Sequence, residues 1–263
     1  MSVQNSIKIN RLLQHAVPKT VLTLPWLALQ GVSKGLAQRY VSSGWLYRIG
    51  HGAYVRAGEA VEWDGALFSL QTQLEMNTHV AGLTALELKG LAHFLPLGQR
   101  SPVILFSDGF DRLPLWFSKK DWGVELIHRN IHLFDAAETF SKSTIQREGF
   151  VLTASTAERA VFELLYGIND NSSFEYAQTV FAGLSMLRPD ELQQLLQACR
   201  SVKVKRIFLW MAETCSHPWV KYLDYNRVDI GKGKRVVYQG GVLDKNFLIT
   251  VPPAKIYEGV PDV

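Results

Sequence analysis

The sequence has little cysteine and no long apolar run. Of the 263 residues only Cys199 and Cys215 are cysteines, too few for a disulfide framework, and we expect both to be reduced thiols on helices. The longest apolar runs are far shorter than the ~18 residues that a membrane span needs. The first residues also lack the basic and apolar segments of a signal peptide. We therefore expect a cytoplasmic protein that contacts no membrane.

Acidic residues are almost missing from the N-terminal segment. Residues 1–60 carry seven lysines and arginines against Glu59 alone. Residues 61–199 have a net charge of −7 and residues 200–263 one of +5, so the total of +4 conceals a segmented chain. A basic N-terminal block is typical of a domain that meets a polyanion.

The remaining composition is that of an ordinary globular protein. A hydrophobic content of 47% with 20% charged residues excludes disorder and coiled-coil rods. The length suits one large domain or two unequal ones. Helical patterns at 61–74 and 81–91 are followed by Pro96 and Gly98, so we predict two domains, 1–95 and 96–263.

The first 56 residues have the pattern of a winged helix-turn-helix. A helix over 2–17 ends at Pro18, a second begins after Thr23, and a third is capped by Ser33 and stops at Gly44. Two β-prone runs follow, at 45–49 and 53–56, separated by a glycine-rich turn that suits a tight hairpin. A helix-turn-helix followed by a hairpin is a winged helix.

The third helix has one apolar and one polar face, and the polar face suits DNA. Its polar side chains can reach bases or phosphates, and the hairpin offers cations that pair with phosphate oxygens. Tyr54 is expected in the core, because alternation along its strand points it inward. The predicted DNA-binding residues are Lys34, Gln38, Arg39, Ser42, Arg48, His51 and Arg56.

Beyond the predicted boundary the chain alternates strands and helices. We expect strands at 102–107, 113–117, 124–128, 150–153, 235–238 and 247–251, and helices at 173–187, 189–199 and 202–215. A further helix is expected to open on a capping box in which Ser155 and Glu158 exchange hydrogen bonds. The predicted fold class is α+β, an N-terminal winged helix-turn-helix domain followed by a mixed α/β C-terminal domain.

Three segments of this chain, in this order, resemble the AbiEi antitoxins of type IV toxin-antitoxin systems. They are Ser43-Gly-Trp-Leu-Tyr-Arg-Ile-Gly-His-Gly-Ala-Tyr-Val-Arg56, Gly82-Leu-Thr-Ala-Leu-Glu-Leu-Lys-Gly-Leu-Ala-His93 and Ser155-Thr-Ala-Glu-Arg-Ala-Val-Phe-Glu163. A strand pair between Gly240 and Pro252 also fits. The chain departs from the family at Ala157, where proline is usual.

The resemblance implies an antitoxin that regulates its own operon and serves in phage defence. The winged helix is implied to bind inverted repeats in double-stranded promoter DNA and to repress transcription. The C-terminal antitoxin domain is implied to counteract a nucleotidyltransferase toxin without a stable complex. A stand-alone transcriptional regulator and a nucleic-acid-processing, nuclease-like enzyme remain as alternatives.

The motifs that suggest metal or catalytic chemistry are weak. His128 and His132 have a helical metal spacing, but their surroundings are typical of a strand. Glu87 and Lys89 resemble part of a nuclease motif, yet Asp64 lies far upstream and no carboxylate set converges on one ion. We therefore predict no catalytic residue, no metal and no cofactor.

A second group of cations lies near the C-terminus. Such charge clusters are usually solvated, but this one could also bind nucleic acid or the toxin's RNA substrate. The predicted second basic patch consists of Lys203, Lys205, Arg206, Lys232, Lys234 and Arg235.

Overall fold

The structure is a computed structural model that describes residues 3–92, 101–109, 112–135 and 141–253. The chain forms two compact units. The first comprises Met1–Val80, Arg100–Ile131 and Thr144–Ala154, and the second comprises Ala81–Gln99, His132–Ser143 and Ser155–Val263. The sequence-based boundary between residues 95 and 96 falls outside the described residues, and that division stays a prediction.

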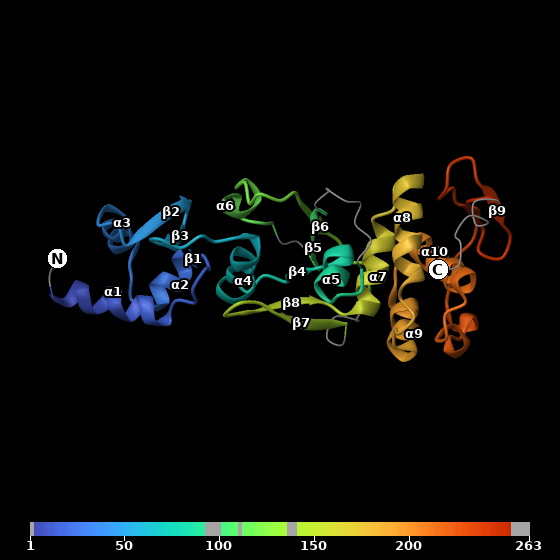
Figure 1. Cartoon of the computed structure of the whole chain (residues 1–263), viewed down its shortest axis with the longest axis horizontal. Helices are drawn as coiled ribbons and strands as arrows, with labels where there is room; N and C mark the ends of the chain where they lie inside the picture. The colour runs from blue at the N-terminus through green and yellow to red at the C-terminus, as the bar shows by residue number, and fades with distance from the viewer. Residues whose placement is uncertain (1–2, 93–100, 110–111, 136–140, 254–263) are drawn as a thin grey trace, which may run out of the picture. The chain divides into compact units, whose positions relative to one another are not determined.

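The first unit begins with a winged helix (Figure 1). Its elements follow in the order α1 (Val3–His15), β1 (Leu22–Thr23), α2 (Leu24–Leu29), α3 (Lys34–Ser42), β2 (Leu46–Gly50) and β3 (Ala53–Arg56). The strands form an antiparallel sheet in the order β1-β3-β2. Thr23 and Ser33 cap α2 and α3 as the sequence predicts, each accepting a backbone N–H with its hydroxyl. These caps stabilise the two helix starts.

A single apolar cluster holds the winged helix together. The side chains of α1, α2 and α3 meet those of β2 and β3, and Tyr54 is buried among them as expected. Burial of such side chains contributes about 1.5–3 kcal/mol each. The cluster includes Ile9, Leu12, Leu22, Leu27, Val32, Leu36, Ala37, Tyr40, Leu46 and Tyr54.

The rest of the first unit is a five-stranded mixed sheet with two helices. Its strands are β4 (Thr78–Val80), β5 (Val103–Ser107), β6 (Leu126–Asn130), β7 (Lys142–Gln146) and β8 (Val151–Ser155), in the order β6-β5-β4-β8-β7. Strand β4 is antiparallel to β5 and parallel to β8. The helices are α4 (Trp63–Gln73) and α6 (Leu115–Ser118).

The prediction of a strand at 113–117 is wrong, because this segment contains α6. Pro114 is its N-cap, and both Trp116 and Phe117 are buried. A short apolar run does not distinguish a strand from a helical turn by periodicity. Helix α6 packs tightly against the hairpin, since a Cβ on Gly50 would lie 2.4 Å from the Cβ of Trp116.

Helix α4 connects the winged helix to the sheet. The Gln73 amide accepts from the backbone N–H of Thr23 at 2.8 Å and donates to the carbonyl of Val21 at 2.8 Å. Two residues earlier, the Gln71 amide accepts from Thr153 N–H at 2.9 Å and donates to two carbonyls of the sheet. The two glutamines tie β1 and β8 to the same helix.

The second unit is mainly helical. It contains α5 (Gly82–Leu88), α7 (Ala157–Tyr166), α8 (Asn171–Ala182), α9 (Pro189–Ala198) and α10 (Val202–Cys215), two short 3-10 helices (Val220–Tyr222, Tyr225–Arg227) and the hairpin β9 (Val242–Asp244) and β10 (Ile249–Val251). Figure 1 shows α7, α8 and α10 side by side. Phe162 of α7 stacks on Phe208 of α10 with 4.6 Å between ring centroids.

The predicted capping box at Ser155 is wrong. Strand β8 continues through Ser155, so α7 starts one residue later and Thr156 is its N-cap. Ser155 Oγ instead donates to Glu163 at 2.7 Å, and Glu158 pairs with Arg188 at 2.9 Å. The predicted strand at 235–238 is also wrong, because that segment forms only a bridge from Arg235 to Ile249.

A buried ion pair lies at the centre of the second unit. Arg159 Nε donates to Glu163 at 2.7 Å, and both side chains are at most 1% exposed. The Glu163 carboxylate also accepts from the backbone N–H of Gly82 at 2.9 Å. No helix in the described part of the chain has the length and hydrophobicity to cross a membrane.

Candidate nucleic-acid interface

The polar face of α3 is exposed along its whole length. Its four predicted contact residues and Gly35 are exposed, while Leu36, Ala37 and Tyr40 on the opposite face are buried. Lys34 and Arg39 make no ion pair with any residue that the structure describes. The structure therefore presents one helix face with two uncompensated cations. The exposed predicted residues of this face are Lys34, Gln38, Arg39 and Ser42.

The hairpin carries two further exposed residues of the predicted site. Arg48 lies on β2 and donates from Nε to the carbonyl of Gly50 at 3.0 Å, which leaves its terminal nitrogens available. His51 is exposed at the turn, where Gly52 has a φ of +72°. Such a positive φ is unfavourable for any residue with a Cβ. Guanidinium and imidazole groups at a hairpin tip can bind phosphate oxygens.

Arg56 differs from the other predicted contact residues. Its guanidinium NH1 lies 3.2 Å from Glu59 Oε1, and its side chain is only 28% exposed. Glu59 is the first acidic residue of the chain, and its other oxygen accepts from the backbone N–H of Lys19 at 2.9 Å. Arg56 is therefore partly neutralised in the free protein.

Sequence reasoning missed several exposed groups of the winged helix. Lys8 and Arg11 are exposed on α1. Trp45 and Tyr47, which flank the start of β2, are 41% and 56% exposed. The alternation of β2 could have revealed both aromatic residues, because Leu46 between them is fully buried.

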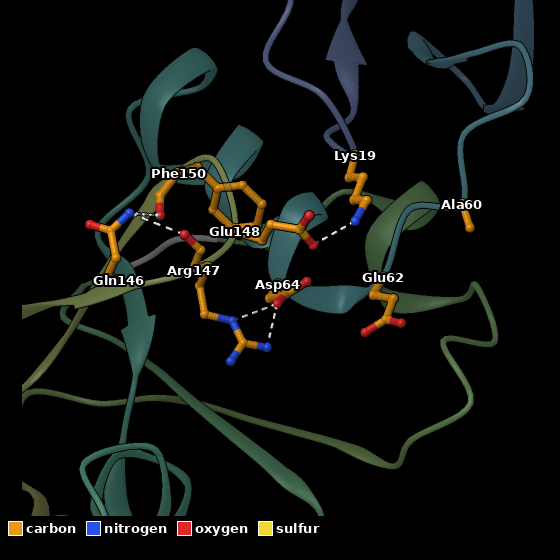
Figure 2. A pocket seen from close by; sticks show the side chains of 8 residues that line it. All are labelled: Lys19, Ala60, Glu62, Asp64, Gln146, Arg147, Glu148 and Phe150. Atoms are coloured by element: carbon orange, nitrogen blue, oxygen red, sulfur yellow. Dashed lines mark hydrogen bonds and ion pairs between the residues drawn. The ribbon is translucent and has the colours of Figure 1, made fainter.

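A polar pocket of about 490 Å³ lies elsewhere in the first unit (Figure 2). Figure 2 shows four of its charged side chains in two pairs, with Lys19 Nζ 2.6 Å from Glu148 and Arg147 NH2 2.6 Å from Asp64. The second Asp64 oxygen accepts from the backbone N–H of Gly65 at 2.7 Å. Both oxygens of the carboxylate considered for a nuclease site are thus engaged by the protein.

The other residues of chemical interest have structural partners. His128 lies on β6 as expected, with Nε2 2.8 Å from Ser107 Oγ. Lys89 donates to Ser143 Oγ at 2.7 Å, and burial lowers the pKa of its ammonium. Within the described ranges, no three His, Cys, Asp or Glu side chains converge as metal ligands would.

The predicted second basic patch does not form one surface, because three of its six residues point into the unit. Lys205 and Arg206 are buried, and Lys203 donates to the carbonyl of Ile168 at 2.5 Å. Sequence reasoning missed the burial of Lys205 and Arg206 because lysine and arginine are rarely buried. The exposed members are Lys232, Lys234 and Arg235.

These features define a winged-helix protein whose remaining chain combines a mixed β-sheet with a mainly helical unit. A family model described as "Transcriptional regulator, AbiEi antitoxin N-terminal domain" matches residues 5–97, and one described as "Transcriptional regulator, AbiEi antitoxin, Type IV TA system" matches residues 100–252. The chain therefore belongs to the AbiEi family of transcriptional regulators, the antitoxins of type IV toxin-antitoxin systems. The family inferred from the sequence segments is confirmed.

A solved structure supports the fold. The RV2827C protein from Mycobacterium tuberculosis matches 92% of this chain and 90% of its own, with a TM-score of 0.62 and 14% sequence identity. At that identity the similarity concerns the fold alone. None of the curated proteins matches the chain.

Proposed function

We propose that this chain is an autorepressing antitoxin whose winged helix binds inverted repeats in its own promoter. The observation that supports this most directly is the exposed face of α3 with its uncompensated cations Lys34 and Arg39. Recognition helices of this class enter the major groove, while the wing contacts the backbone. Because an operator is DNA inside the cell, the protein is expected to act in the cytoplasm.

The contacts divide into two kinds. Gln38 and Arg39 are placed to reach base edges, because they lie in the middle of the exposed face of α3. Lys34, Arg48 and His51 lie at the helix entry and the hairpin, where phosphate contacts fix the register. Ser42 Oγ donates to the carbonyl of Gln38 at 3.2 Å, so it must rotate to donate to DNA.

The DNA-binding part is tested by fluorescence anisotropy on the chain's own promoter and on a mixed-sequence duplex. The triple variant K34A/Q38A/R39A is expected to lose the preference for the promoter. The control K119A/K120A/K245A removes three exposed lysines elsewhere, one charge more than the triple variant, and is expected to keep this preference. Equal binding of both duplexes by the unchanged protein would overturn the proposed operator recognition.

The second part of the proposal is that the chain counteracts a nucleotidyltransferase toxin without a stable complex and without acting as an enzyme. Membership of the antitoxin family supports this part. Co-expression with the adjacent gene is expected to restore growth, while the two proteins separate on gel filtration. No rescue of growth, or a co-eluting complex, would contradict it.

The remaining candidates are a stand-alone regulator and a nuclease-like enzyme. Absence of a nucleotidyltransferase gene beside this one would favour the stand-alone regulator. The engagement of Asp64 by Arg147 and Gly65 argues against a nuclease centre at that carboxylate. Loss of toxin neutralisation in Glu87→Ala, with the fold and promoter binding intact, would favour the enzyme.

A further inference from the structure

A loop of the second unit combines two glycines with three exposed cations. Residues 231–235 read Gly-Lys-Gly-Lys-Arg, and we call this segment the GKGKR loop. The side chains of Lys232, Lys234 and Arg235 are exposed. None of the three forms an ion pair with a residue in the described part of the chain. The loop therefore concentrates positive charge at the surface.

The buried Arg206 holds the GKGKR loop from within. Its Nε donates to the carbonyl of Ile230 at 2.7 Å, and its NH1 donates to the carbonyl of Gly233 at 2.6 Å. NH1 also lies 3.2 Å from the carbonyl of Leu248, on the segment that leads into β10. The guanidinium thus fixes the loop through the carbonyl of Gly233 and that of Ile230, which precedes the loop.

Arg206 has no negative partner among the residues that the structure describes, in contrast to Arg159 with Glu163. It is fully buried, and its NH2 group has no hydrogen-bond partner among the described residues. Burial and the charge of Arg235 lower the pKa of the Arg206 guanidinium. A buried cation without a counter-charge is unfavourable, so an anion near this loop would stabilise the folded protein.

The backbone of the loop also suits an anion. Gly231 and Gly233 have φ values of +64° and +78°, and Lys232 between them has a negative φ. Such an alternation turns successive N–H groups toward one side, as in anion-binding nests. The amides of Lys232, Gly233 and Lys234 have no hydrogen-bond partner within the described ranges. Arg206 binds the carbonyl of Gly233 and not these amides, so the amides remain for a ligand.

We propose that the GKGKR loop is a phosphate-binding site that takes the phosphodiester backbone of a nucleic acid. Small-molecule ligands are usually enclosed in concave sites, whereas these cations are exposed on a turn. The segment also lacks the Ser or Thr and the spacing of a nucleotide-binding P-loop. The site goes beyond the proposed operator binding, which uses none of these residues.

The test separates the loop from the winged helix by starting from the full-length variant K34A/R39A/R48A. In this background the loop variant K232A/K234A/R235A is compared with the control K119A/K120A/K245A, which removes the same charge from other exposed positions. Binding is measured by anisotropy against salt, on a mixed-sequence duplex DNA and on a mixed-sequence single-stranded RNA.

The loop variant is expected to reduce the log-log salt slope by about 2 on single-stranded RNA or about 3 on duplex DNA, from three phosphates at about 0.7 or 0.9 each. The probe that shows the loss identifies the source of the phosphates. If the loop variant matches the control on both probes, the proposal is wrong. Operator recognition is measured in a separate experiment, in which the protein with an unchanged winged helix binds its promoter. Failure of the loop proposal can therefore be told apart from failure of the proposed operator binding.

A second measurement tests the backbone contribution without removing charge. Inorganic phosphate at millimolar concentrations is expected to shift the amide NMR signals of Lys232, Gly233 and Lys234 in a saturable way. Gly233→Ala is expected to weaken this binding about fivefold, because its positive φ disfavours a side chain. The added Cβ itself meets no atom within 4 Å, so the change creates no clash. Signals that do not respond to phosphate would overturn the proposal.

Discussion

The ion pair of Arg56 with Glu59 predicts that an acidic residue restrains DNA binding. The pair is partly exposed, at 28% and 19%, and such pairs are worth about 0–1 kcal/mol. Arg56 has to leave Glu59 before it can bind a phosphate, so releasing it is expected to raise affinity by up to about fivefold. Glu59→Gln provides this release, and its amide oxygen can still accept from Lys19 N–H, which now lies 2.9 Å from Glu59 Oε2.

The assay is a salt titration of promoter binding for three variants. Glu59→Gln is expected to steepen the log-log slope by about 0.9, the value of one phosphate. Arg48→Ala is expected to reduce the slope by about 0.9 and to weaken binding about tenfold, since a charge-assisted hydrogen bond contributes about 1.5 kcal/mol. Arg56→Ala is expected to change the slope and the affinity less than Arg48→Ala does, because Glu59 already compensates part of the charge of Arg56.

The matched control is Glu62→Gln, which removes an exposed carboxylate three residues further along. It lowers the negative charge by the same amount without touching the ion pair of Arg56. If Glu59→Gln and Glu62→Gln bind the promoter alike, Arg56 makes no phosphate contact and the reasoning is refuted.

Three further predictions concern the folded protein. Glu163→Ala is expected to lower the free energy of unfolding of the second unit by about 3–5 kcal/mol in urea, because Arg159 is left buried and unpaired; a loss below 1 kcal/mol would contradict the structure. Gly50→Ala is expected to cost about 1–3 kcal/mol through its overlap with Trp116, and an unchanged thermal midpoint would count against that packing. Burial raises the pKa of Cys199 to about 11, so iodoacetamide at pH 8 should label it only after denaturation, as peptide mass spectrometry would detect.

Local signals predicted the winged helix well. Thr23 and Ser33 were predictable as helix caps because each hydroxyl accepts from a backbone N–H only three residues further along. The hairpin was predictable from its glycine-rich turn, in which Gly52 has a positive φ. The ion pair between Arg56 and Glu59 could also have been predicted from the sequence, since its partners are three residues apart.

Features that depend on distant segments could not be predicted in this way. Strands β4 and β7 owe their conformation to pairing within the sheet. Helix α7 begins one residue later than the sequence predicts, because β8 extends through Ser155. Arg206 is buried because carbonyls 24 to 42 residues away accept its hydrogen bonds, and no local pattern encodes such contacts.

The measurement that tests the central claim most directly is the salt dependence of binding to the chain's own promoter. If α3 and the wing together neutralise about five phosphates, the log-log slope is expected to be roughly −4 to −5. The slope should become shallower by about 2 in K34A/Q38A/R39A, which removes two cations at about 0.9 each, and stay unchanged in K119A/K120A/K245A. Promoter binding that does not depend on salt would contradict the account.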